Sequence, residues 1–343
     1  MIMKAIYLTK TGDAEKTFEF RDVQVPEPKP DEICIKVHSF GLNFADVLAR
    51  QGIYQEAPPL PYVLGYDVAG TVHSIGSEVH NYTIGQRVTA LTKFGGYAEY
   101  ACTMKEGVSL IADDIDYCTA TALATQACTA FYCLEECATL HAGDRVLIQA
   151  AAGGVGSIMV QLAKHKGCIV YGTASTKKQD YLLELGVDYP IDYTQLDFAE
   201  EIRRTLGDYP GVDFAFDSIG GATFKKAFHL LTPSGKIIFI GAASQLKNGK
   251  SNMLTTLKLA AGFGLFSPIQ LVMASKGIIG VNMMRVADHR PEIFKHCLDE
   301  VIKLYESGVI KPSIGKTFEA SDISLAHHYL ESRQSIGKVA CVW

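Results

Sequence analysis

From residue 145 onward, short apolar runs alternate with longer segments in which apolar residues recur at helical spacing. The short runs predict buried strands, and the longer segments predict helices. Because parallel strands need a crossover between them, this alternation predicts an α/β domain with a doubly wound parallel sheet. The six predicted strands are Arg145–Ile148, Cys168–Ala174, Tyr189–Tyr193, Val212–Ser218, Lys236–Ala242 and Gly277–Met283; the predicted helices include Lys178–Leu185, Phe198–Leu206 and Ala222–Leu231, the last stopped by Pro233 and Gly235.

The first 125 residues follow a different pattern, with many turns and short alternating segments. In "EICIKVHSF", Ile33, Ile35 and Val37 face one way, and the residues between them face the other. This predicts a β-rich domain. A helical stretch at residues 290–308 and a last strand, "GKVACVW", follow the six predicted parallel strands, and we expect this tail to return to the first domain. The predicted domains are therefore 1–125 with 290–343, and 126–289.

A turn almost without side chains joins the first predicted parallel strand to its helix, in "IQAAAGGVGS" at residues 148–157. The first N–H groups of a helix have no intrahelical partner and attract anions, so small residues here favour a bound diphosphate. The stretch fits the dinucleotide fingerprint G-x-G-x-x-G with Ala151 in the first position. The alternative is a glycine-rich turn without a ligand. The candidate cofactor-binding residues are Ala152, Gly153, Gly154, Val155 and Gly156.

The end of the second predicted parallel strand indicates which nucleotide binds. An acidic residue there would hydrogen-bond the ribose of NAD, but the segment reads "YGTASTKKQD". Ser175, Lys177 and Lys178 offer a hydroxyl and positive charge to a 2′-phosphate, and Lys178 is the preferred candidate. This favours NADP(H). The alternative is that the two lysines form an ordinary solvated helix face.

Composition narrows the class of protein. The net charge of −5 offers no surface for nucleic acid, and the N-terminus lacks the apolar stretch of a signal peptide. Nine cysteines without paired C-x-x-C spacing indicate reduced thiols, and we expect a cytoplasmic protein. The uncharged stretch between Lys258 and Lys276 is interrupted by glycines and Pro268 and is short for a bilayer span. We expect it to be a buried crossover or a subunit interface, with no stable membrane insertion.

Characteristic stretches are spread over nearly the whole length of the chain: "GLNFADVLARQGIY", "LGYDVAGTV", "AAAGGVGS", "GTASTKK", "YPIDY", "VDFAFDSIGG" and "GVIKPSIG". In these stretches the sequence resembles the medium-chain dehydrogenase/reductase superfamily, in particular the zinc-free quinone oxidoreductase branch and its vesicle amine transport protein-like group. The resemblance implies a GroES-like β-rich catalytic domain and a Rossmann nucleotide-binding domain. It also implies that no zinc is bound, because Asn43, Tyr66 and Asp67 stand where zinc-dependent relatives carry cysteine, histidine and glutamate, and Asn and Tyr are poor zinc ligands.

The same resemblance assigns roles to single residues. Asn43 is expected beside the nicotinamide and the substrate oxygen, and Tyr54 is expected to donate a proton or hydrogen bond to that oxygen. The alternatives are a structural Asn in a turn and an ordinary rim aromatic, with solvent as the proton donor. Asp46 is expected to brace the loop. The further cofactor-binding candidates are Thr129 near the nicotinamide, Tyr193 on the adenosine, and Ser218, Gly241 and Ala242 at strand ends, each of which has a purely structural alternative.

These expectations together predict an enzyme. Without a metal to hold an alkoxide, the reaction that fits is hydride transfer from NADPH, bound between the domains, to a small-molecule quinone or α,β-unsaturated carbonyl. Relatives pair their last nucleotide-domain strands, here "GIIGVNM", so we expect a homodimer. The alternative function is that of an NADPH-binding protein of the same fold with a non-catalytic, membrane- or assembly-associated role.

Overall fold

The computed structural model describes residues 1–241 and 261–343, which form two compact units. Unit 1 contains Met1–Cys128, Met283–Gly308 and Pro312–Trp343, and unit 2 contains Thr129–Asn282 and Val309–Lys311. Each unit has its own sheet and its own buried core. Each unit is therefore described by itself.

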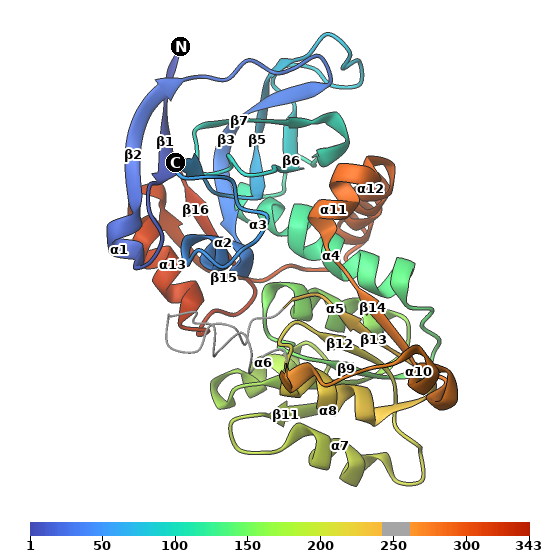
Figure 1. The fold of residues 1–343 in the computed structure, drawn as a ribbon. Helices are drawn as coiled ribbons and strands as arrows, with labels where there is room; N and C mark the ends of the chain where they lie inside the picture. Colours follow the sequence, from blue (N-terminus) through green and yellow to red (C-terminus); the bar gives the residue numbers. More distant parts are fainter. Residues whose placement is uncertain (242–260) are drawn as a thin grey trace. The chain divides into compact units, whose positions relative to one another are not determined.

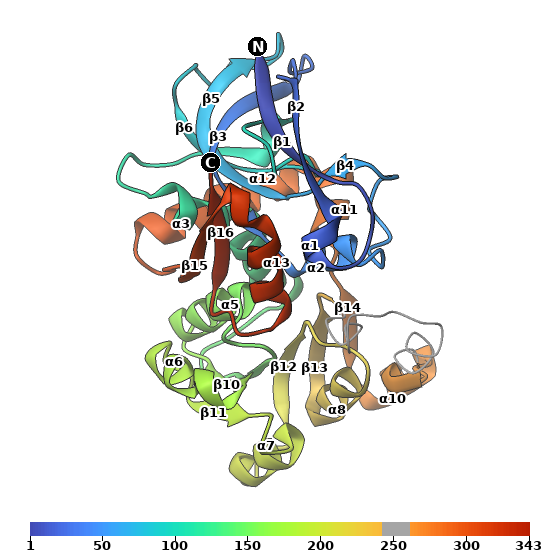
Figure 2. The ribbon, with the colours of Figure 1, turned by 90° about the vertical axis from the view of Figure 1, so that its left-hand side faces the viewer.

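Unit 2 is built on a six-stranded parallel sheet of order β11-β10-β9-β12-β13-β14. From β9 the chain builds outward first to one edge and then to the other, which is the doubly wound order that the sequence predicts. Figures 1 and 2 show these strands side by side. The strands are β9 (Arg145–Ile148), β10 (Ile169–Ala174), β11 (Tyr189–Asp192), β12 (Val212–Asp217), β13 (Leu231–Phe239) and β14 (Gly277–Gly280).

Helices connect these strands and bury their apolar faces. Asp197 caps the N-terminus of helix α7, because its carboxylate accepts hydrogen bonds from the N–H groups of Ala199 and Glu200. Ile202 of this helix lies in the core with Leu147 of β9. The helical segments of this unit are α4 (Cys128–Phe131), η3 (Tyr132–Cys137), α5 (Gly154–His165), η4 (Thr176–Lys178), α6 (Gln179–Glu184), α7 (Phe198–Leu206), α8 (Ala222–Leu230) and α10 (Pro268–Ala274).

One strand boundary predicted for unit 2 needs correction. Strand β13 begins at Leu231, before the predicted start at Lys236. Pro233 and Gly235 lie between its two paired segments, because Leu231 pairs with Val212 and the pairing with β12 resumes only at Lys236. A proline is tolerated at such a bulge. Of the two alternatives for 259–275, the buried crossover fails for the described part, because α10 contains no buried residue, and the subunit interface stays a prediction.

Unit 1 contains a seven-stranded sheet of order β15-β16-β3-β5-β6-β8, with β7 also paired to β3, and a smaller sheet of order β2-β1-β4. Strand β16, near the C-terminus, pairs with β3, so the end of the chain lies in the sheet of the N-terminal segment (Figure 2). The strands are β1 (Ile2–Leu8), β2 (Phe18–Gln24), β3 (Glu32–Leu42), β4 (Tyr62–Val63), β5 (Asp67–Ile75), β6 (Arg87–Leu91), β7 (Tyr100–Met104), β8 (Val108–Leu110), β15 (Ile314–Glu319) and β16 (Lys338–Val342).

The core of unit 1 contains Ile33, Ile35 and Val37 from β3, which confirms the alternation read from the sequence. The helical segments of this unit are α1 (Ala14–Thr17), α2 (Phe44–Arg50), η1 (Lys105–Gly107), α3 (Tyr117–Ala122), the π-helical η2 (Leu123–Ala127), α11 (Met283–His289), α12 (Pro291–Glu306), η6 (Ala320–Asp322) and α13 (Ile323–Glu331). The predicted helix at 290–308 corresponds to α12.

Candidate functional site

The glycine-rich turn lies where β9 passes into α5. Thr173 of β10 fixes this turn, because its backbone oxygen accepts the N–H of Ala151 at 2.9 Å and its hydroxyl accepts the N–H of Ala150 at 3.2 Å. Helix α5 begins after Gly153, and no side chain caps it. The N–H groups of its first turn, from Gly154 onward, have no intrahelical partner. The turn therefore presents uncovered donors at the carboxyl end of the central strand, where the strand order reverses.

Packing distinguishes two glycines of the turn. A Cβ at Gly156 would lie 2.3 Å from the carbonyl oxygen of Ala150, so only glycine allows α5 to approach the turn this closely. A Cβ at Gly153 would lie 3.2 Å from the same oxygen, a tight contact that a small shift relieves. Gly156 is thus required by helix packing, while Gly153 leaves the N-terminal end of α5 uncovered. Ala152 and Val155 complete the turn, and Ala152 is buried.

The candidates for the adenosine end lie at the carboxyl ends of β10 and β11. The N–H of Tyr193 donates to the carbonyl oxygen of Ala174 at 3.2 Å, which places Tyr193 beside the segment that begins at Ser175. The Tyr193 side chain is half-exposed. Ser175 precedes the short helical turn that ends at Lys178, and burial lowers the pKa of the Lys178 ammonium. Unit 2 therefore brings Ser175, Lys178 and Tyr193 to one edge of the sheet.

Sequence reasoning missed Asp192, which ends β11 at this edge. Its carboxylate accepts hydrogen bonds from the hydroxyls of Thr176 at 2.5 Å and Thr194 at 2.6 Å. A carboxylate at this edge repels a bound phosphate, and this repulsion is weaker when neighbouring hydrogen-bond donors engage the carboxylate. The signal was present in the sequence, because Asp192 stands inside the quoted stretch "YPIDY".

The ends of β12 and β13 also meet. A Cβ at Gly241 would lie 3.8 Å from the carbonyl oxygen of Ser218, so these two candidates are neighbours; Ala242 lies outside the described residues. Asp217, which the sequence analysis did not single out, accepts N–H groups from Ile219 at 2.6 Å and Gly220 at 2.9 Å. Burial raises the pKa of the Asp217 carboxyl to about 6. Thr129 is buried in α4.

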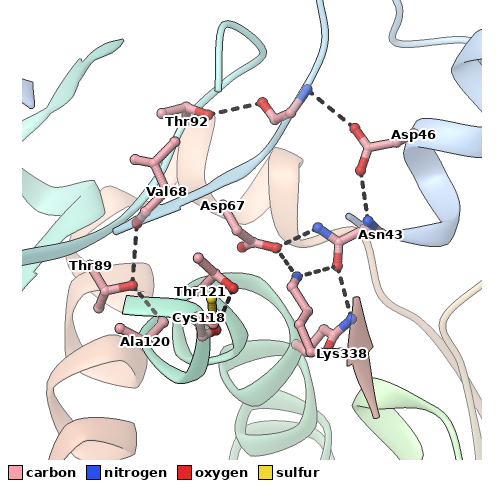
Figure 3. Close-up of polar contacts among 12 residues, drawn as sticks. Asn43, Asp46, Asp67, Val68, Thr89, Thr92, Cys118, Ala120, Thr121 and Lys338 are labelled. Atoms are coloured by element: carbon pink, nitrogen blue, oxygen red, sulfur yellow. Dashed lines mark hydrogen bonds and ion pairs between the residues drawn. The ribbon is translucent and has the colours of Figure 1, made fainter. Parts of the chain in front are cut away.

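In unit 1 the side chain of Asn43 is held by three groups from distant parts of the chain (Figure 3). Its amide nitrogen donates to Asp67 of β5, and its amide oxygen accepts from the Lys338 ammonium at 3.1 Å and from Gln126 at 3.2 Å. Gln126 lies in the π-helical segment η2, a kind of irregularity that often occurs at functional sites. The orientation of the Asn43 amide is therefore fixed, with one N–H of its NH₂ group left over.

Lys338 and Asp67 form an ion pair in which both side chains are fully buried. Lys338 begins β16 and passes directly over β3, where a Cβ at Gly41 would lie 2.2 Å from the lysine Cε. Glycine at position 41 thus makes room for the lysine. One carboxylate oxygen of Asp67 is buried and has no hydrogen-bond partner among the described residues. Sequence analysis missed this pair, because nothing local connects residues 271 positions apart.

Asp46 braces the loop, as the sequence analysis expected. Its carboxylate accepts the N–H of Asn43 at 2.7 Å and the N–H of Gly65 at 3.2 Å, tying the start of α2 to the segment before β5. The side chain is fully buried, and this burial raises the pKa of its carboxyl to about 7, with the nearby charge of Asp67 acting in the same direction. Asp46 therefore contributes position rather than an accessible proton.

Tyr54 lies next to Tyr66, with ring centroids 6.2 Å apart in an edge-to-face arrangement. Tyr54 packs against the core of unit 1 but stays partly exposed, whereas Tyr66 is buried. Burial raises the pKa of both phenols above the usual value of about 10, so both are protonated at neutral pH. The Tyr66 hydroxyl has no hydrogen-bond partner within residues 1–241 and 261–343.

Two features of the described residues concern metal binding and membrane insertion. No group of three or more His, Cys, Asp or Glu side chains in the described part of the chain is arranged to hold a metal ion. None of the described helices combines the length and the apolar character needed to cross a membrane.

Comparison with known proteins gives consistent matches. Residues 29–113 match the alcohol dehydrogenase GroES-like domain, and residues 185–340 match the family described as zinc-binding dehydrogenase. The synaptic vesicle membrane protein VAT-1 homolog of Rattus norvegicus is 32% identical over 342 residues, covering 99% of this chain and 84% of that protein. A 2-haloacrylate reductase of Burkholderia sp is 32% identical over 355 residues, covering 99% and 98%. The structure of Escherichia coli quinone oxidoreductase complexed with NADPH is 26% identical, with a TM-score of 0.86 and coverage of 99% and 100%.

Proposed function

The chain belongs to the VAT-1-like group of the medium-chain dehydrogenase/reductase superfamily, and on this premise we propose that it is a zinc-independent, NADPH-dependent oxidoreductase. Its substrate is a quinone or an α,β-unsaturated carbonyl compound. Unit 2 is the cofactor-binding domain, and unit 1 carries the candidate catalytic residues Asn43 and Tyr54. The observation that carries the proposal is the N-terminus of α5 after Gly153, which no side chain caps. It lies at the carboxyl end of β9, where the strand order of the parallel sheet reverses.

When bound, the cofactor would supply the hydride. Gly154 and Val155 present backbone N–H groups to its diphosphate, and Gly153, whose own N–H donates to the carbonyl oxygen of Ala150, lets the backbone come close to it. Ser175 and Lys178 hold the 2′-phosphate, and Tyr193 packs on the adenosine. Thr129, Ser218 and Gly241 leave room at the nicotinamide end. This reading is supported by the structure of the related quinone oxidoreductase with NADPH, and by the position of the glycine turn, Ser175, Tyr193, Ser218 and Gly241 after the carboxyl ends of their strands.

Zinc does not fit the residues at the candidate catalytic position. Asn43 and Tyr66 offer an amide and a phenol, which are poor zinc ligands. Asp67 offers a carboxylate, but the Lys338 ammonium already pairs with it in a fully buried site. A second cation next to this ammonium would meet strong repulsion at low dielectric. Hydrogen-bond donors therefore polarise the substrate oxygen in place of a metal. Such donors are sufficient for a conjugated acceptor, because conjugation spreads the incoming charge onto that oxygen.

Asn43 is the first of these donors. Its amide oxygen is held by Lys338 and Gln126, and one N–H is held by Asp67, so the remaining N–H has a fixed direction. The ammonium behind the amide strengthens it as a donor. Tyr54 is the second donor, with a phenol that stays protonated at neutral pH. Lys338 and Asp67 act as positioning residues, because they reach the substrate only through Asn43.

We propose that the protein is a homodimer. Strand β14 pairs only with β13 in the described sheet and so forms an open edge. Beside it, α10 exposes three large apolar side chains, each at least 74% accessible: Ile269, Val272 and Met273. Such a patch next to an open edge favours a second copy of the chain.

A second candidate function is that of an NADPH-binding protein without turnover. It is favoured by the engagement of the Asn43 amide, which leaves a single donor for a substrate. The experiment that separates the two mixes the purified protein with NADPH and a panel of quinones, enones and 2-haloacrylate, and follows the absorbance of reduced nicotinamide. Enzyme function predicts acceptor-dependent consumption of NADPH. Tight NADPH binding without consumption by any acceptor supports the non-catalytic function instead.

A further inference from the structure

Cys34 and Cys102 lie directly opposite each other on the antiparallel strands β3 and β7. In the same register, the N–H of Val37 donates to the carbonyl oxygen of Glu99 at 2.8 Å, so Val37 and Glu99 form a hydrogen-bonded pair. Hydrogen-bonded and non-hydrogen-bonded pairs alternate along an antiparallel ladder. Counting back from Val37, the two cysteines therefore occupy a non-hydrogen-bonded pair, in which Cα atoms are about 4.5 Å apart and side chains are closest.

This spacing is compatible with a disulfide, which spans Cα separations of roughly 4.4 to 6.8 Å. The Cys34 side chain points away from the core that contains Ile33 and Ile35, because it alternates with those residues along β3, and Cys102, its partner on β7, lies on the same face of the sheet. Both thiols are free. Cys34 is buried, while Cys102 is partly exposed and its sulfur lies 3.7 Å from the carbonyl oxygen of Pro26. Small reagents in solvent can therefore reach the pair through Cys102.

The two thiols also affect each other's ionisation. Their interaction lowers the pKa of Cys34 and raises the pKa of Cys102. Of the two, Cys34 therefore ionises more readily. By contrast, burial raises the pKa of the Cys137 thiol to about 11. Thiolate is the reactive form, so Cys34 differs chemically from the partly exposed Cys137 of unit 2.

We propose that Cys34 and Cys102 form a redox-modification site, at which a hydroperoxide converts the two thiols into a reversible intramolecular disulfide. One thiolate attacks a peroxide oxygen; an S–O bond forms, the O–O bond breaks, and the departing hydroxide takes a proton to become water. The second thiol then attacks the sulfenic sulfur, forming the S–S bond and releasing a second water. Two thiols are oxidised and hydrogen peroxide is reduced to two waters. This site is independent of NADPH and of the proposed enzyme function.

Tryptic mapping of the full-length protein tests the proposal. Cleavage after Lys36 and Lys93 places Cys34 and Cys102 on separate peptides, each without a second cysteine. After treatment with hydrogen peroxide, we expect a linked pair of these peptides under non-reducing conditions, lighter by two hydrogens and released by dithiothreitol. Cys102→Ser abolishes this species, and the matched Cys137→Ser variant retains it.

Two results would overturn the proposal. One is oxidation of Cys102 to sulfinic or sulfonic acid without a link to Cys34. The other is a wild-type protein in which both thiols stay reduced, or pair with other cysteines, while peroxide is consumed elsewhere. Because Cys102 is partly exposed, its serine variant is expected to fold, and a Cys34→Ser variant that also loses the link gives an independent check.

Discussion

The ammonium of Lys338 is paired with the carboxylate of Asp67, and neither side chain is accessible to solvent. The two residues come from the beginning of the last strand and the beginning of β5, and together they fix the amide of Asn43 (Figure 3). A buried ion pair seldom adds stability over an apolar pair, because both charges lose their hydration. Its value in this protein is therefore the orientation that it gives Asn43.

Removing one partner of this pair should be costly. Lys338→Met leaves the Asp67 charge uncompensated in the interior, and we expect a loss of about 3–5 kcal/mol in the free energy of unfolding. The double variant Lys338→Met, Asp67→Leu should recover part of this loss while NADPH turnover stays low, because the amide of Asn43 is released. Urea unfolding and steady-state kinetics measure the two effects. Lys36→Met, at an exposed lysine of β3, is the control. A double variant less stable than both single variants would contradict the coupling.

Asp46 gives a pH-dependent prediction. Its pKa in the folded protein is about 7, above the value of 3.8 for the free side chain, so the unfolded chain ionises first as pH rises. Asp46 therefore stabilises the fold fully below about pH 4, and this contribution is lost as the pH rises to about 7. In Asp46→Asn the loss is absent. The stability deficit of the variant should be largest near pH 4 and should shrink toward neutral pH.

Denaturation midpoints measured between these pH values, for wild type and Asp46→Asn side by side, provide the check. A deficit that is constant across the range, or that grows with pH, would mean that the carboxyl is ionised at its usual pKa.

Lys178 should determine the choice between NADPH and NADH. Loss of a charge-assisted hydrogen bond costs roughly 1.5–3 kcal/mol, so Lys178→Ala should raise the KM for NADPH by about tenfold or more and leave the KM for NADH unchanged. Lys177→Ala is the matched control, because that neighbouring lysine is exposed. Equal effects of the two substitutions on NADPH would show that the phosphate is held elsewhere.

The two glycines of the turn should respond differently to alanine. Gly156→Ala forces a Cβ to within 2.3 Å of the Ala150 oxygen, so it should lower stability as well as NADPH affinity. Gly153→Ala has more room, at 3.2 Å, and should mainly weaken NADPH binding. Thermal unfolding and NADPH titration of both variants separate the two effects. If Gly156→Ala were as stable as wild type, the close approach of α5 to the turn would be in doubt.

The fold could be read from the sequence where the pattern is local. The strands of unit 2 and the glycine turn follow from apolar runs and small residues, and the six-stranded parallel order confirms them. The start of β13 at Leu231 could not be read, because its pairing with Val212 precedes the local turn signal at Pro233 and Gly235, and the ladder with β12 resumes only at Lys236. The Lys338–Asp67 pair was equally inaccessible, because a lysine in an apolar strand gives no sign of its partner. The roles of Asn43 and Tyr54 stay predictions.

The most direct test of the central claim follows an isotope. Protein treated with a strong chelator is incubated with NADPH carrying deuterium at C4 and with a quinone or enone acceptor, and the product is analysed by mass spectrometry. The proposed function predicts that deuterium is transferred to an enone product, and that the rate of NADPH consumption is unchanged by the chelator. Loss of activity on chelation that added zinc restores, or NADPH consumption without label in the enone product, would contradict it.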